Sequence, residues 1–146
     1  MTKPIYLDYN ATTPVDERVF DAMKPYFCEK FGNAASRSHA YGWEAEEAVE
    51  KAREQVAGLI GAAKKTIIFT SGATEGNNTV VKGIVEASKK KPAHVITQAT
   101  EHKCILDSCK EIEKEGHEVT YLPVDAKGRV SPERVEAAIK ENTVLV

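Results

Sequence analysis

The sequence predicts an α/β protein containing part of a doubly wound, mostly parallel sheet. Two observations support this fold class. Short apolar runs rich in β-branched residues alternate along the chain with longer segments whose apolar residues recur every three or four positions. These longer segments have the length of helices, and strands joined by such helices form parallel βαβ units. The 146 residues are 42% hydrophobic and 29% charged, which is typical of one folded domain.

The first 14 residues are predicted to form an N-terminal segment, with a short apolar run at 5–8. A helix should follow through Met23, because Thr13 is a suitable N-cap with proline after it and an acidic residue two positions further on. The segment Phe31–His39 has too many small and turn residues for a regular element, so it is predicted to be a loop.

The middle of the chain should contain a long amphipathic helix over 42–60. Its apolar residues recur at helical spacing, and Gly61 is a suitable C-terminal residue. A strand is predicted at 66–70, followed by a glycine turn and a helix from about Ala73 to about Ser88.

The remaining predicted elements continue the alternation of strands and helices. In order they are a strand at 94–97, a helix at 103–115, a strand at 118–124, a turn at 125–128, a helix at 131–140 and an apolar strand-like run at 143–146. A buried strand needs neighbours and an exit turn, so we expect residues 15–146 to be an incomplete large domain that ends inside a strand. Ligands bind beyond the carboxyl ends of strands in such sheets, so half of that pocket should be missing.

Composition excludes several functional classes. A net charge of −2 with interspersed acidic and basic residues argues against a nucleic-acid surface. No apolar run approaches the roughly 20 residues needed to span a bilayer, and the N-terminus lacks the apolar core of a signal peptide. We therefore expect a cytoplasmic location, or the mitochondrial matrix if a transit peptide has been removed. Cys28, Cys104 and Cys109 form no C-x-x-C pair, so neither a disulfide framework nor a metal site is predicted.

The segment Thr66–Asn78, T-I-I-F-T-S-G-A-T-E-G-N-N, is the most informative part of the chain. A helix that begins near Ala73 would direct unpaired N–H groups and a positive dipole end toward an anion. Gly72 allows close approach of a phosphate, and hydroxyl side chains, including that of Thr74, surround the turn. The segment matches neither a P-loop nor a dinucleotide fingerprint. On these residues alone, a phosphate pocket and a plain capped helix are equally supported.

Two further groups of residues fall at predicted strand or loop ends. His102 could stack on a flat ring, transfer protons or cap a helix, while the adjacent Lys103 is expected to be a solvated charge. In the loop Phe31–His39, the side chains of Asn33, Arg37 and His39 suit a carboxylate. The alternative for this loop is a surface segment with local hydrogen bonds.

Four motifs in order resemble those of cysteine desulfurases, most closely the NifS/IscS kind of iron-sulfur-cluster assembly. They are Tyr6–Pro14, then Phe31–Asn33 with Ser36–His39 and Gly42–Trp43, then Thr70–Glu75, then Thr100–Lys103. The resemblance covers the whole chain. Two small departures are Ala34, where the family commonly has proline, and Gly76–Asn77 after the phosphate motif, where side chains vary.

The resemblance implies the large domain of a fold-type-I enzyme that uses pyridoxal 5′-phosphate. It implies that Ala73 and Thr74 bind the phosphate and that His102 stacks on the pyridine ring and serves as an acid or base. The lysine that binds the coenzyme covalently and the cysteine that forms the persulfide would both lie beyond Val146. Lys103 is then not that lysine, and none of the three cysteines is that nucleophile.

The implied reaction removes sulfur from L-cysteine to give L-alanine and an enzyme persulfide. The implied partners are an iron-sulfur scaffold or another sulfur acceptor, a second copy in a homodimer and a second chain that completes the fold. The segment by itself should be inactive. The alternatives are a non-catalytic truncated segment that acts only in binding or dimerisation, or another class V enzyme such as a selenocysteine lyase or an aminotransferase. The Thr-Glu-His-Lys and Ser-Arg-Ser-His stretches count against the aminotransferase.

Overall fold

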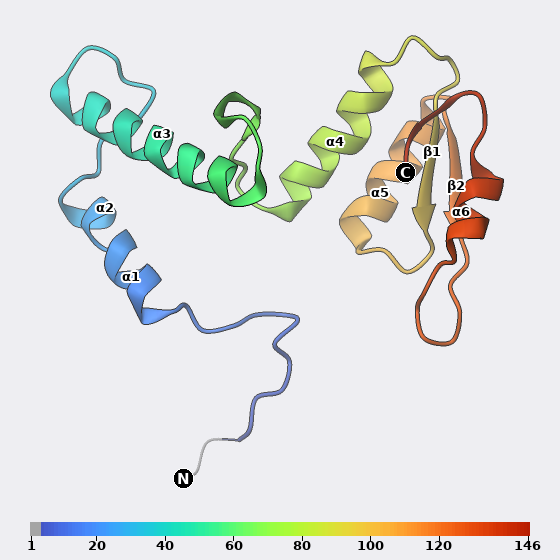
Figure 1. The fold of residues 1–146 in the computed structure, drawn as a ribbon, viewed down its shortest axis with the longest axis horizontal. Coiled ribbons are helices and arrows are strands. Elements are labelled where there is room, and N and C mark those ends of the chain that lie inside the picture. Colours follow the sequence, from blue (N-terminus) through green and yellow to red (C-terminus); the bar gives the residue numbers. More distant parts are fainter. Residues whose placement is uncertain (1–3) are drawn as a thin grey trace. The chain divides into compact units, whose positions relative to one another are not determined.

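The computed structural model describes residues 4–146, which divide into two compact units, one ending at Ile68 and one spanning Phe69–Val146 (Figure 1). The first unit contains α1 (Glu17–Met23), α2 (Pro25–Cys28), α3 (Ala40–Ile60) and the short 3₁₀ helix η1 (Lys64–Thr66). The second contains α4 (Ala73–Ala87), β1 (His94–Gln98), α5 (Lys103–Lys114), β2 (Glu118–Leu122), α6 (Pro132–Ala138) and β3 (Thr143–Leu145). Among residues 4–146, no helix is both long and apolar enough to cross a lipid bilayer.

The second unit is built on a parallel three-stranded sheet with the order β2-β1-β3. Val95 of the central strand pairs with Val119 of β2, and the pairing with β3 contains an irregularity between His94 and Val95. Parallel neighbours need crossover connections, and α5 and α6 supply them. In Figure 1, α4 and α5 lie on one side of the sheet, and α6 lies beside β2. The predicted α/β class with a parallel sheet is therefore confirmed.

The core of the second unit lies between β1 and the helix pair α4 and α5. Val95 is 1% exposed and belongs to one apolar cluster with Val85 of α4 and Ile112 of α5. Full burial of such side chains stabilises a fold by about 1.5–3 kcal/mol each. This packing holds α4 and α5 against the sheet.

The opposite face of β1 carries a fully buried histidine, His94. Its Nδ1 lies 2.8 Å from the Thr143 hydroxyl of β3, and its Nε2 lies 2.7 Å from the Thr120 hydroxyl of β2. Burial lowers the pKa of His94, Lys140 lowers it further, and Glu118 opposes the shift. The imidazole therefore joins all three strands as a neutral group.

Most predicted elements of the second unit are confirmed. The helix from Ala73, the strand at 94–97 and the helix at 103–115 agree with the structure within one residue at each end. The strand at 118–124 and the helix at 131–140 are each two residues shorter at their carboxyl ends, and the run at 143–146 contains β3.

The strand predicted at 66–70 was wrong. The chain forms η1 up to Thr66 and then continues without regular structure to the start of α4. A strand needs a hydrogen-bonded neighbour, and in residues 4–146 none of the three strands pairs with this run. Its apolar Ile68 and Phe69 remain 76% and 48% exposed.

The first unit contains the predicted loop and the predicted long helix. Residues 31–39 form no regular element, and α3 ends at Gly61 with a left-handed φ of 67°. The first helix starts later than predicted, at Glu17, because Asp16 rather than Thr13 accepts the capping hydrogen bond from Arg18 N–H. The apolar run at 5–8 is irregular and exposed. The predicted division at residue 14 stays a prediction.

The buried His94 predicts a pH dependence of stability. The unfolded chain titrates this residue near pH 6.5, whereas the folded state holds its pKa lower. As the pH falls below about 6.5, His94 becomes protonated in the unfolded state but stays neutral in the folded state. The free energy of unfolding should therefore fall by at most about 1.4 kcal/mol per pH unit. Urea unfolding between pH 5 and 8 measures this slope. The His94→Gln variant should lose this part of the pH dependence of the free energy of unfolding. An equal pH dependence in both proteins would contradict its attribution to His94.

Candidate functional site

The amino end of α4 lacks a side-chain cap. Its N-cap residue is Gly72, which has no side chain, and no group in residues 4–146 accepts a hydrogen bond from the backbone N–H of Ala73 or Thr74. The first N–H groups of a helix have no partner inside the helix, and its dipole makes this end positive. The end of α4 therefore offers two N–H donors to an anion, as the sequence predicted.

Neither the backbone conformation nor a neighbouring atom of the described chain requires glycine at position 72. Its φ of 164° is extended backbone, and a Cβ there would meet nothing within 4 Å. Within the described residues, a side chain at position 72 would therefore collide with no other part of the chain.

Glu75 shapes the turn before α4. Its Oε2 accepts hydrogen bonds from the backbone N–H of Ser71 at 2.7 Å and from the Ser71 hydroxyl at 2.6 Å. These bonds lower the pKa of Glu75 and keep it ionised. Because the Ser71 hydroxyl is committed to Glu75 and the Thr70 hydroxyl donates to the Gly72 carbonyl, Thr74 is the hydroxyl left at the helix end.

The amino end of α5 is capped by His102. The ring Nδ1 accepts a hydrogen bond from the backbone N–H of Cys104 at 3.2 Å, while the side chain remains exposed. This is the capping role that the residues alone allowed for this histidine. Stacking on a flat ring stays a prediction, and capping is compatible with it because only one ring nitrogen is used. Lys103 is exposed, as expected for a solvated charge.

A direct contact joins the beginnings of α4 and α5. The Nδ2 of Asn77, in the second turn of α4, donates to the Sγ of Cys104 at 3.1 Å, and this sulfur lies 3.1 Å from the Nδ1 of His102. The two helices pack side by side and begin at the same end of the sheet (Figure 1). The predicted phosphate residues and the predicted ring-stacking histidine therefore lie at neighbouring helix ends.

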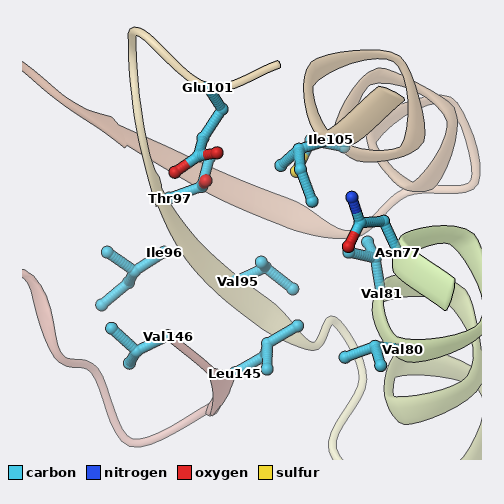
Figure 2. Close-up of a pocket in the computed structure, with 11 residues that line it drawn as sticks. Asn77, Val80, Val81, Val95, Ile96, Thr97, Glu101, Ile105, Leu145 and Val146 are labelled. Carbon is cyan, nitrogen blue, oxygen red and sulfur yellow. The ribbon is translucent and has the colours of Figure 1, made fainter. Parts of the chain in front are cut away.

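A mostly apolar cavity of about 260 Å³ lies next to these helix ends (Figure 2). Asn77, Thr97 and Glu101 supply its polar groups, and Figure 2 shows the Glu101 carboxylate beside Thr97. Its other lining residues come from both helices, β1 and β3, and are Val80, Val81, Val95, Ile96, Ile105, Cys109, Leu145 and Val146. Such a lining suits apolar groups, so this cavity differs in character from the uncapped helix end at Ala73.

The proposed carboxylate residues of the first unit make local hydrogen bonds. Asn33 Oδ1 accepts from the Ala35 backbone N–H at 2.9 Å, and His39 Nδ1 accepts from the Gly42 backbone N–H at 3.2 Å. The Arg37 carbonyl accepts from the Trp43 indole N–H at 2.8 Å. These contacts match the alternative of a locally bonded loop, and substrate binding by Asn33, Arg37 and His39 stays a prediction.

Two close backbone approaches hold this loop against the start of α3. A Cβ at Gly42 would lie 1.7 Å from the Ser36 carbonyl oxygen, and a Cβ at Gly32 would lie 2.0 Å from the Tyr41 carbonyl oxygen. Neither position tolerates a side chain without movement of the backbone. The motif glycines at these positions therefore fix the shape of the loop that carries Arg37.

Sequence reasoning missed Glu75, Asn77 and Cys104 as parts of the site. Ser71 and Glu75 are four positions apart, one more than in a capping box, so that motif does not reveal their hydrogen bond. The Asn77–Cys104 contact joins residues 27 positions apart, so it depends on tertiary packing and has no local sequence signature.

Residues 5–146 match the aminotransferase class-V family, and the chain belongs to this family of pyridoxal-phosphate-dependent enzymes. Among curated relatives, the cysteine desulfurase IscS of Anaeromyxobacter sp. (strain Fw109-5) is 58% identical over 146 residues, and that of Rickettsia massiliae (strain Mtu5) is 56% identical. Both alignments cover 100% of this chain and 36% of the relative. The chain therefore spans little more than a third of their length.

Solved structures show the same fold. A NifS-like protein has a TM-score of 0.87 and 42% identity, covering 95% of this chain and 38% of that chain. SspA, solved in complex with cysteine, has a TM-score of 0.86 and 40% identity, covering 94% of this chain and 40% of that chain. The predicted family resemblance and fold class are both confirmed.

The loop geometry predicts opposite effects for two alanine substitutions in α3. Gly42→Ala should lower the free energy of unfolding by about 1–3 kcal/mol, because the new methyl group collides with the Ser36 carbonyl. Gly58→Ala is the matched control, since no atom lies within 4 Å of its Cβ position, and it should raise stability by about 0.5–1 kcal/mol. Urea unfolding followed by circular dichroism measures both. A neutral Gly42→Ala would show that the loop is not held this way.

Proposed function

We propose that this chain is the part of a cysteine desulfurase that holds the phosphate of pyridoxal 5′-phosphate. The observation that carries the proposal is the uncapped amino end of α4, which lies next to the histidine-capped end of α5. The class-V family membership and the cysteine desulfurase relatives support the same function.

The residues at α4 fit a phosphate group. The backbone N–H groups of Ala73 and Thr74 have no acceptor in the described part of the chain, and the Thr74 hydroxyl lies on the same helix turn. Hydrogen bonds from several N–H groups and the positive helix end favour a dianion. The absence of a side chain at Gly72 leaves room for it. Ala73 and Thr74 would therefore hold the phosphate.

His102 would lie against the coenzyme ring and exchange protons near it. Its imidazole is exposed, and the Cys104 backbone N–H holds it in one orientation. The bound coenzyme would supply an electron sink for the bonds broken in the amino acid substrate. The protein's own part of that chemistry here is to anchor the phosphate, orient the ring and hold a proton at His102.

The complete enzyme would act on L-cysteine, release L-alanine and pass the sulfur to an iron-sulfur scaffold or another acceptor. A homodimer in the cytoplasm is the assembly that we propose for it. The side chains of Asn33, Arg37 and His39 would then approach the substrate carboxylate. SspA was solved in complex with cysteine, which supports cysteine as the substrate class.

Coenzyme binding tests the phosphate site. The chain should bind pyridoxal 5′-phosphate at least tenfold more tightly than pyridoxal, because only the former carries the group that α4 would hold. Thr74→Val should weaken phosphate-dependent binding by about tenfold, since it removes one hydrogen bond to a charged group. Thr79→Val is the matched control, because the Thr79 hydroxyl donates to the Glu75 carbonyl within the same helix. Equal binding of both ligands, measured by calorimetry, would refute the site.

Activity is best tested in a chimaera. Residues 1–146 would replace the matching part of the Anaeromyxobacter relative, which shares 58% identity with them. The chimaera should form L-alanine and sulfide from L-cysteine, whereas the 146-residue chain alone should not. His102→Ala should lower kcat in the chimaera by about 10²-fold or more if this ring serves as an acid or base. A chimaera that binds the coenzyme yet forms no alanine would contradict the desulfurase assignment.

A further inference from the structure

Two histidines of this chain cap helices in the same way. The Nδ1 of His102 accepts from the backbone N–H of Cys104, and the Nδ1 of His39 accepts from the backbone N–H of Gly42, both at 3.2 Å. A backbone N–H can only donate, so each Nδ1 must present its lone pair. In the neutral ring the proton then sits on Nε2.

The two histidines differ in a second contact at Nδ1. The thiol of Cys104 lies 3.1 Å from the Nδ1 of His102, whereas in residues 4–146 no side chain donates to the Nδ1 of His39. Nδ1 is already an acceptor toward the Cys104 N–H, so the thiol must be the donor in this contact. The hydrogen-bonded form of Cys104 is therefore the protonated thiol.

Asn77 fixes the direction of the thiol. An asparagine Nδ2 can only donate, and it lies 3.1 Å from the Cys104 sulfur. The sulfur therefore accepts from Asn77 while its own hydrogen points to His102. Asn77 thus donates to Cys104, and Cys104 donates to His102. These two hydrogen bonds connect α4 to the imidazole.

We propose that Cys104 and Asn77 are positioning residues for His102. They hold the Nδ1 lone pair as the acceptor of both contacts, so Nε2 carries the proton of the neutral ring and is the N–H that the ring can donate toward a ligand. Asn77 belongs to the helix whose amino end would hold the phosphate, so the same contact ties the ring orientation to the phosphate anchor. This inference rests on the proposed function for its catalytic meaning, although the hydrogen bonds themselves can be tested without the coenzyme.

The test is the tautomer of His102 in the whole 146-residue chain, measured without coenzyme. Labelling with ¹⁵N-histidine and recording ring nitrogen shifts, at a pH where the rings are neutral, gives the ratio of the Nε2–H to the Nδ1–H form for each of the four histidines. His102→Gln identifies the His102 signals. The ratio should be higher for His102 than for His39, which serves as an internal reference with the same backbone cap.

Substitutions should change this ratio in a graded way. Cys104→Ala should lower it by roughly two- to fivefold, because it removes one weak hydrogen bond to Nδ1. Cys104→Ser keeps a side-chain donor and should retain a ratio within about twofold of the unchanged chain. Asn77→Ala should shift the ratio in the same direction as Cys104→Ala by a smaller factor. Asn78→Ala is the matched control, because its amide donates to the Thr74 carbonyl within α4.

The proposal fails if Cys104→Ala leaves the His102 ratio unchanged. It also fails if the ratio of His39 changes by the same factor, because the effect would then be a general loss of structure. A second readout is the absorption band of bound pyridoxal 5′-phosphate, which should shift in Cys104→Ala and return in Cys104→Ser. If the unsubstituted chain does not bind the coenzyme, the proposed function is refuted. The tautomer ratio of His102 would still test whether Cys104 and Asn77 position the ring.

Discussion

The burial of β1 is the constraint on which the rest of the second unit depends. This strand pairs with parallel neighbours on both edges, and Val95 packs beneath α4 and α5. A chain that leaves a parallel strand must turn back beside it, so the carboxyl end of β1 lies where α5 begins. The packing of α4 against α5 then brings a second helix start to that end. The uncapped end of α4 and the imidazole of His102 become neighbours because one strand is covered on one face by two helices.

The two helix starts solve the same problem of unpaired N–H groups in different ways. The end of α5 is satisfied by the side chain of His102, whereas the end of α4 has only Gly72 before it. A ligand can therefore bind at α4 without displacing a cap. At α5 the capping side chain, His102, is itself the candidate acid or base. The hydrogen bond from the Cys104 N–H that stabilises the helix therefore also sets which ring nitrogen carries the proton. Removal of His102 should thus affect both helix stability and chemistry, whereas Cys104 allows the second effect to be studied separately.

Local sequence patterns predicted the parts of the fold that local forces decide. Helical periodicity, Ser131 as an N-cap and Gly61 as a C-terminal residue placed their helices correctly. The run at 66–70 failed because strand formation depends on a partner, and periodicity cannot say whether one is present. At the site, the helix end at Ala73 was predictable from turn chemistry. The Asn77–Cys104 contact was not, because it arises from the packing of two helices.

The histidine at the start of β1 also makes misaligned strands costly. Thr120 faces the same side of the sheet as His94, and Thr143 sits beside it on the other edge. A slip of either neighbour by one residue would turn its hydroxyl to the other face. The imidazole would then lose a partner while buried, a penalty of about 1–3 kcal/mol. The hydrogen bonds of this buried polar group therefore specify the register of the three strands. Apolar side chains alone would discriminate less between alternative registers.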